Sequence, residues 1–203
     1  MLFFKLIIAR ITVPHAEKNT SIYEITDPAV LLVSKEHPSK VLTLFDYSSL
    51  SQKHLPIGLH ELENEILKFQ LWHAYYDFPA RNFFLELEYD KAIKTEVQDN
   101  GTLFQAVRGN STPKMRARSL DHGKFFEIVL DNKCLTVDAT KSKERDSYPL
   151  RFKPCVKSEN QTFTFASKML ALCKLGNELC PGNEGDLTTA EAIVLKKLAE
   201  FIS

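Results

Sequence analysis

Residues 124–165, KFFEIVLDNKCLTVDATKSKERDSYPLRFKPCVKSENQTFTF, hold the pattern that decides the fold. Four short runs rich in apolar, aromatic and β-branched residues alternate with turns of Asn, Asp, Lys and Ser. The four runs are residues 124–130, 134–137, 148–155 and 161–165. Short β-rich runs at this spacing predict an all-β sandwich or barrel, not a helical domain.

A looser copy of this pattern occupies residues 21–72. Its first two predicted strands are the apolar runs 29–33 and 41–45, which a Pro-Ser turn separates. The Ser-rich segment 48–64 has no strong period, so we expect a loop or one short helical turn there. The copy ends in Gln-x-Trp with Trp72, the only tryptophan, which we expect in the core because its side chain buries a large area.

Residues 82–120 form a third and weaker copy. An Asn-Gly pair at 100–101 is a strong hairpin signal between two of its runs. The predicted strands are residues 83–87, 92–97, 102–108 and 115–120. The chain thus shows three copies of one unit, and internal repetition at such a period predicts a repeated architecture.

The length and the charge of the chain exclude several classes of protein. A chain of 203 residues can bury one sizeable core, which predicts one domain. Lys+Arg and Asp+Glu number 26 each, so the net charge is near zero. This argues against a nucleic-acid binder, whose affinity comes from neutralising phosphates with an excess of basic residues. No run of about eighteen uncharged apolar residues exists, so no membrane span is expected. No sequence motif of a catalytic site occurs, which predicts a protein without enzymatic activity or cofactor.

Residues 1–16 are hydrophobic enough for a secretory signal peptide. Lys5 and Arg10 interrupt the apolar core that such a signal needs, and the cleavage site is poorly marked. The alternative is a first strand of the fold over residues 6–13, which are rich in β-branched residues. Both interpretations of residues 1–16 stay open.

The chain has four cysteines, Cys134, Cys155, Cys173 and Cys180. They form no C-x-x-C pair, and no His lies at zinc-ligand spacing, so no metal site is expected. Pairing Cys134 with Cys155 and Cys173 with Cys180 is one of three connectivities that the sequence leaves open. Disulfides and the three sequons, at Asn19, Asn110 and Asn160, favour a secreted glycoprotein.

The carboxyl end differs from the repeats. We expect residues 169–173 to form a further strand that closes the sheet, and residues 181–203 to form a turn and a helix. Thr188 and Glu191 make a capping box, whose side chains satisfy exposed amides at a helix start. The following apolar residues recur at helical spacing, which predicts an amphipathic helix of about fourteen residues that packs on the domain.

The third copy resembles one repeat of the ricin-B-type β-trefoil lectins. That repeat runs Cys-Leu-Asp-Val, a loop, a strand ending in Cys, and Asn-Gln-x-Trp. The corresponding residues here are 134–137 (CLTV), 149–155 (PLRFKPC) and 160–163 (NQTF), and Gln-Leu-Trp at 70–72 matches the last element in the first copy. The resemblance implies a β-trefoil of three four-stranded repeats over residues 17–180, followed by the C-terminal helix. In size and divergence the chain also resembles the ricin-B-like proteins of microsporidia.

In this family a sugar site uses the Asp of Cys-Leu-Asp-Val, a polar and an aromatic residue of the third strand, and the Asn before Gln. The chain has Thr136, Arg151 and Lys153 at the first three positions and retains Asn160. Asp138 lies two residues after Thr136, so on a strand it could replace the acidic acceptor. The resemblance therefore implies a glycan site of Thr136, Asp138, Arg151 and Asn160 that lacks a ring for stacking.

A second candidate site is basic. Lys114, Arg116 and Arg118 alternate, so on a strand they would project from one face. This face is either a solvated strand surface or an anion site. With Lys141, Lys143 and Arg145 it could hold a sulfated or phosphorylated polysaccharide.

The sequence thus predicts a secreted lectin-like module whose partner is a glycan or a glycosylated surface. Two alternatives remain. The trefoil could have lost sugar binding and serve as a protein–protein component of an extracellular coat or wall, or it could inhibit a protease through an exposed loop such as 48–64. In either case Gln70, Trp72, Gln161 and Phe163 are expected to be structural.

Overall fold

The computed structural model describes residues 22–24, 26, 29–48, 52–77, 81–98, 103–109, 114–121 and 124–168. These residues form β-strands and short 3-10 turns joined in one sheet. The predicted signal peptide or first strand, the strand at 169–173, the C-terminal helix and the pair Cys173 and Cys180 lie outside the described residues.

Twelve of the strands fall into three successive sets of four. The first set is β2 (Val30–Ser34), β3 (Lys40–Leu44), β5 (Ile57–Glu61) and β6 (Trp72–Asp77). The second set is β7 (Asn82–Leu87), β8 (Ile93–Val97), β9 (Phe104–Arg108) and β10 (Arg116–Leu120). The third set is β11 (Phe125–Leu130), β12 (Lys133–Val137), β13 (Tyr148–Pro154) and β14 (Phe163–Ser167). Short strands β1 (Ile22–Glu24) and β4 (His54–Leu55) pair with β6 and β9.

The first and last strands of each set close into a barrel. β2 pairs with β6, β6 with β7, β10 with β11, β11 with β14, and β14 with β2. The remaining contact, between β7 and the β10 end, is the bridge from Phe83 to Met115. The middle strands of each set form the hairpins β3–β5, β8–β9 and β12–β13. A closed six-stranded barrel with three hairpins is a β-trefoil, which confirms the predicted fold class.

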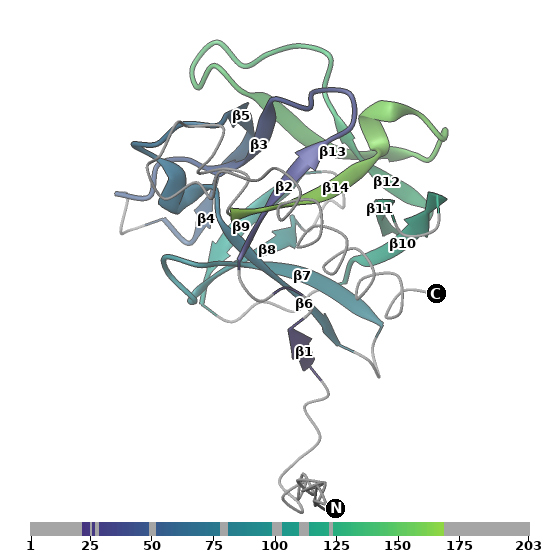
Figure 1. Cartoon of the computed structure of the whole chain (residues 1–203), viewed down its shortest axis with the longest axis horizontal. Helices are drawn as coiled ribbons and strands as arrows, with labels where there is room; N and C mark the ends of the chain where they lie inside the picture. Colours follow the sequence, from purple (N-terminus) through teal and green to yellow (C-terminus); the bar gives the residue numbers. More distant parts are fainter. Residues whose placement is uncertain are drawn as a thin grey trace, which may run out of the picture.

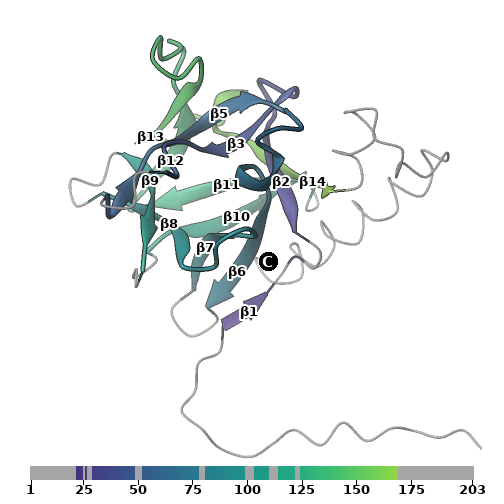
Figure 2. The ribbon, with the colours of Figure 1, turned by 90° about the vertical axis from the view of Figure 1, so that its left-hand side faces the viewer.

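The figures show how the hairpins lie on the barrel. β2 and β14, from opposite ends of the described chain, run side by side and complete the ring (Figure 1). In Figure 2 the hairpins β3–β5 and β12–β13 lie at the end of the molecule opposite to β1. The pairing of β14 with β2 thus closes the ring within the described residues.

The strand predictions for the three copies are confirmed to within about two residues, but the loop or helical turn predicted over 48–64 is wrong. This segment contains β4 and β5, and Leu55 and Leu59 are fully buried. The sequence hides the strand because Gly58 has a low strand propensity. The packing favours glycine there, since a Cβ at Gly58 would lie 3.0 Å from the carbonyl oxygen of Tyr148, closer than most Cβ contacts in proteins.

The core fills the barrel with large side chains from all three sets. Trp72, Phe83, Phe104, Phe126 and Phe163 are fully buried, which confirms the prediction that Trp72 is a core residue. The indole nitrogen of Trp72 donates a hydrogen bond of 3.0 Å to the carbonyl oxygen of Leu42, so its polar atom is satisfied.

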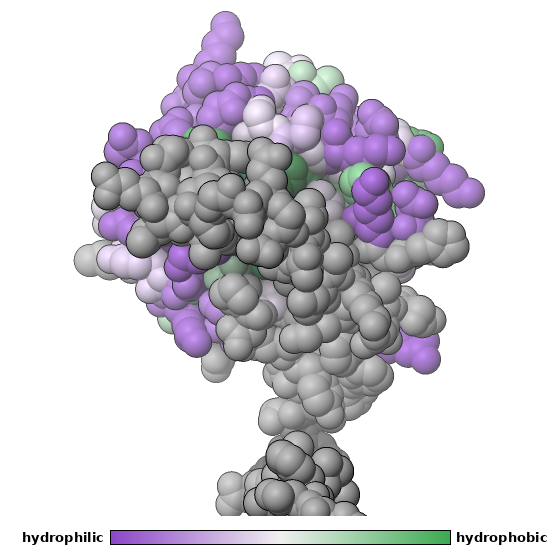
Figure 3. All heavy atoms as spheres, in the orientation of Figure 1, coloured by the Kyte–Doolittle hydropathy of each residue, from purple (hydrophilic) through white to green (hydrophobic). Residues whose placement is uncertain are grey.

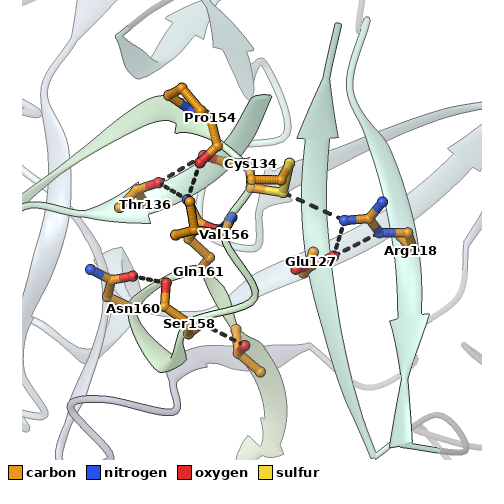
Figure 4. Close-up of a disulfide and its surroundings, with 11 residues drawn as sticks. Arg118, Glu127, Cys134, Thr136, Pro154, Val156, Ser158, Asn160 and Gln161 are labelled. Carbon is orange, nitrogen blue, oxygen red and sulfur yellow. Dashed lines mark hydrogen bonds and ion pairs between the residues drawn. A yellow bond between two sulfur atoms is a disulfide. The ribbon is translucent and has the colours of Figure 1, made fainter. Parts of the chain in front are cut away.

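A buried glutamine ties the hairpin to the fourth strand in the third set. Gln161, in the 3-10 turn Glu159–Gln161, donates from Nε2 to Thr136 Oγ1 and to the carbonyl oxygen of Pro154, both at 2.9 Å. Its Oε1 accepts from the amide of Val156 at 2.8 Å. These three hydrogen bonds join the 3-10 turn to β12 and to the end of β13 (Figure 4), and we call this arrangement the Gln161 bracket.

Gln70 makes the same bracket in the first set. It follows the 3-10 turn Leu67–Phe69, and its Nε2 donates to Thr43 Oγ1 at 3.0 Å and to the carbonyl oxygen of Glu61 at 2.7 Å. Its Oε1 accepts from the amide of Glu63 at 3.2 Å. The equivalent contacts show that Gln-x-Trp and Gln-x-Phe serve the same structural purpose, as predicted.

Replacing Gln161 by Leu should lower the free energy of unfolding by about 3 kcal/mol, because three hydrogen bonds of about 1 kcal/mol each are lost. Urea unfolding followed by tryptophan fluorescence measures the change. The exposed Gln98→Leu is the control and should change stability by less than about 0.5 kcal/mol. Equal midpoints for both variants would contradict the structural role of the bracket.

A disulfide joins Cys134 to Cys155 across a separation of 21 residues, which is one of the pairings that the sequence left open. It connects the start of β12 with the segment that follows β13, beside the Gln161 bracket (Figure 4). It therefore closes the hairpin of the third set covalently.

The variant Cys134→Ala/Cys155→Ala should unfold at lower urea, with a loss of about 3 kcal/mol from the loop entropy that the disulfide removes. Mass spectrometry of proteolytic fragments under non-reducing conditions checks the pairing itself. A stability equal to that of the unmodified protein would show that the closed loop adds nothing to the hairpin.

Candidate functional site

The hairpin β12–β13 carries three of the four predicted sugar-site residues. Thr136 and Arg151 are cross-strand partners, and the amide of Asp138 donates to the carbonyl oxygen of Pro149 at 2.9 Å. Thr136 is 4% exposed, donates to the carbonyl oxygen of Cys134 at 2.8 Å and accepts from Gln161. Its hydroxyl is thus used by the fold, and it lies below the surface that a ligand would contact.

Asp138 forms a three-residue cluster with Arg151 and Lys153. Arg151 Nε lies 2.9 Å from Asp138 Oδ2, and Lys153 Nζ lies 2.6 Å from Oδ1. The carboxylate is 18% exposed and the two cations are about half exposed. One carboxylate bridges two cations, so the cluster has a net positive charge at neutral pH. Exposed pairs of this kind stabilise a protein by about 0–1 kcal/mol, so a ligand that replaced one of them would cost little stability.

Asn160 lies on the 3-10 turn after the hairpin. Its Oδ1 accepts a hydrogen bond of 2.5 Å from Ser158 Oγ (Figure 4). The neighbouring Gln161 connects this turn to Thr136, but the Asn160 side chain makes no contact with Asp138 or Arg151 among the described residues. The structure thus brings Thr136, Asp138 and Arg151 together and places Asn160 at an adjoining position.

The role of Lys153 was not foreseen. The sequence identified it only as the residue that replaces an aromatic ring, whereas the structure shows it as the second cation on Asp138. A signal was present, because Arg151 and Lys153 alternate along one strand and therefore share a face. Both are exposed and flank the buried Phe152.

The basic residues near β10 differ in what they do. Arg116 and Arg118 are exposed on either side of buried Ala117, as the alternation predicted, and Lys114 is exposed just before the strand. Arg118 Nε donates to Glu127 Oε2 at 2.6 Å, and its Nη2 lies 3.7 Å from Cys134 Sγ (Figure 4). Glu127 is 1% exposed, so Arg118 is committed to neutralising a buried carboxylate.

The second basic set lies in the loop between β12 and β13. Lys141 Nζ is 2.5 Å from Asp146 Oδ1, and this hydrogen bond lowers the pKa of the Asp146 carboxyl and raises the pKa of Lys141. Arg145 pairs with Asp46 at 2.9 Å and with Glu144 at 3.2 Å. Acidic neighbours thus offset most of the charge of this set.

The surface of the described part is mainly polar on the face in Figure 3. Tyr89 and Val156 are the exposed large hydrophobic residues within the described ranges. In these ranges no group of three or more His, Cys, Asp or Glu could hold a metal ion. A helix long and apolar enough to cross a membrane does not occur in the described part of the chain.

No protein-family model matches the sequence, and no curated protein sequence is similar to it. Solved structures with a similar fold include a ricin B-like lectin of Macrolepiota procera in complex with lactose. It is 13% identical with a TM-score of 0.51, over 74% of this chain and 98% of the lectin. The designed three-fold symmetric protein ThreeFoil is 15% identical with a TM-score of 0.54, over 70% of this chain and 99% of the design.

A mosquitocidal holotoxin is also similar, at 14% identity and a TM-score of 0.55. The match covers 69% of this chain and 17% of the toxin, so the chain corresponds to a small part of that protein. At these identities the comparisons show the fold. The chain has the β-trefoil fold, which it shares with this ricin B-like lectin and with ThreeFoil.

Replacing Arg118 by Ala should destabilise the protein by up to about 3 kcal/mol, because Glu127 would be left as an unpaired buried charge. The value lies at the low end of the range for buried pairs since Arg118 is itself half exposed. Arg116→Ala, on the same strand and face, is the matched control and should cost less than about 0.5 kcal/mol. Equal urea midpoints for the two variants would refute the difference in role.

Proposed function

We propose that the chain is a secreted glycan-binding module without catalytic activity. The observation that carries the proposal is the Asp138 cluster with Arg151 and Lys153, displayed on the β12–β13 hairpin of a trefoil. The similar fungal lectin was solved in complex with lactose, which supports a sugar as the ligand class. The disulfide supports an oxidising compartment, and therefore secretion.

Recognition would use hydrogen bonds in place of a stacking ring. The Asp138 carboxylate accepts from sugar hydroxyls, while Arg151 and Lys153 donate to hydroxyl oxygens or to an anionic substituent. Asn160 adds an amide donor from the adjoining turn. Since Lys153 stands where the family has an aromatic residue, the site lacks stacking energy and depends on charge, so affinity should fall as salt increases.

A glycan array with neutral, uronate-containing and sulfated glycans tests this function. Binding should weaken at least about tenfold in Asp138→Ala/Asn160→Ala, since two hydrogen bonds to the ligand, each worth about 1 kcal/mol, are lost. Lys143→Ala is the control, because this exposed loop residue lies outside the Asp138 cluster. Binding that survives the double substitution at full strength would place the sugar elsewhere.

A second candidate function is that of a protein–protein component of an extracellular assembly. The observation that favours it is Thr136, which is buried and hydrogen-bonded at the position where the lectin family has its acidic acceptor. If the folded protein binds none of the glycans on the array, this function is favoured over sugar binding.

The third alternative, a protease inhibitor, was expected to act through an exposed loop such as 48–64, and this segment differs from the expectation. Its residues 54–61 form paired strands with buried Leu55 and Leu59.

A further inference from the structure

A cavity of about 360 Å³ opens between the three repeats near their hairpins. It is formed by three stretches that are distant in sequence. Its walls come from β4 and the start of β5, from the start of β9, and from β13 with the loop before it. Its volume lies at the lower end of the range of about 300–1,000 Å³ for small-molecule sites.

The cavity surrounds the pseudo-three-fold axis of the trefoil. Ile57, Phe104 and Leu150 hold equivalent places, since each pairs with the last residue of the second strand in its own repeat. The residues that precede them, Pro56, Leu103 and Pro149, all line the cavity. Each repeat thus contributes one equivalent apolar side chain to a ring around the axis.

The walls are held in place before any ligand arrives. The amide of Ser142 donates to the carbonyl oxygen of Ser147 at 2.7 Å, which fixes the loop before β13. The close approach of Gly58 to Ser147 and Tyr148 packs this loop against β5. A preformed site loses less conformational entropy on binding than a mobile one does.

The ionisable side chains in the cavity lining are all basic. Arg145, Arg151 and His54 line the cavity, and its lining contains no Asp or Glu. The guanidinium of Arg145 is already occupied by Asp46 and Glu144. Arg145 therefore stabilises the wall of the cavity and is not the group expected to bind a ligand.

Arg151 is different, because only its Nε is engaged, by Asp138. Its two terminal nitrogens have no hydrogen-bond partner among the described residues, and the same holds for the hydroxyls of Ser142 and Ser147. His54 uses Nδ1 toward Gln105 at 2.8 Å and toward Glu96 at 3.2 Å, which leaves Nε2 unoccupied. The rim thus offers hydrogen-bond donors above an apolar ring.

We propose that this cavity binds an anionic sugar residue, a pyranose that carries a carboxylate or a sulfate. The anionic group pairs with the terminal nitrogens of Arg151, since a planar guanidinium matches such groups with two parallel hydrogen bonds. The ring of the sugar lies on Pro56, Leu103 and Pro149. This inference rests on the proposed glycan binding and adds a second place for it, which shares Arg151 with the Asp138 cluster.

Titration of the ¹⁵N-labelled protein with D-glucuronic acid, followed by NMR, tests the proposal, with D-glucose as the neutral match. Glucuronate should shift the resonances of cavity residues and bind at least about tenfold more tightly than glucose. Arg151→Gln should weaken glucuronate binding at least about tenfold, and Ser142→Phe, which fills the cavity from its rim, should abolish it.

Lys91→Gln is the matched control. It removes one positive charge at an exposed position that neither lines the cavity nor belongs to the Asp138 cluster, so glucuronate affinity should stay within about threefold. The urea midpoint of each variant verifies that it is folded. A comparable loss in Lys91→Gln, or no loss in Arg151→Gln and Ser142→Phe, would overturn the cavity as the site.

Two further results separate the inferences. If inorganic sulfate binds as tightly as glucuronate, the cavity recognises an anion alone, and the sugar part of the proposal is overturned. If array glycans bind through Asp138 and Asn160 while glucuronate leaves the cavity resonances unshifted, the cavity proposal fails and the glycan function stands. Absence of binding in both experiments overturns both.

Discussion

In the first and third repeats of this trefoil, the hydrogen bonds of a buried glutamine join the strands of the repeat. Gln70 and Gln161 each bond the threonine of the second strand and two backbone groups near the end of the third strand. The side chains are 0% and 1% exposed, so these bonds form away from water, where leaving a polar group unpaired is costly. The bracket fixes the orientation of the hairpin relative to the barrel. This orientation determines which side chains of the hairpin are exposed at the surface.

The bracket also explains why Thr136 is not a surface residue of the hairpin. Thr136 accepts from Gln161 and is buried, so this position supports the fold and offers nothing to a ligand. The acidic group at the surface is Asp138, one residue past the end of β12, and the two cations of β13 hold it. The fold thus depends on Thr136 and the proposed glycan binding on Asp138, two neighbouring residues of one hairpin, so a substitution at Asp138 should leave the bracket intact.

The sequence predicts the parts of the fold that depend on local pattern. The third repeat was predicted strand by strand because its apolar runs alternate with clear turn residues. Local pattern does not predict β5, because Gly58 has a low strand propensity. The glycine is favoured at this position by the close approach of Tyr148, which belongs to another repeat. The sequence also does not predict the ion pair of Asp138 with Lys153 or the cavity on the axis. They depend on segments near 55, 104 and 150 that only the closed barrel brings together.

The second repeat shows how the divergence of one copy creates a site between copies. By strand pairing, Glu96 stands where the other repeats have Thr43 and Thr136. Glu96 lies 3.2 Å from His54 Nδ1, and Gln105 Nε2 lies 2.8 Å from the same nitrogen. His54 belongs to the first repeat, so these contacts cross the boundary between two repeats and border the cavity. Three identical repeats would surround the axis with three identical sets of side chains, whereas the unequal repeats here make the cavity lining asymmetric, which is the basis of the single site proposed for it.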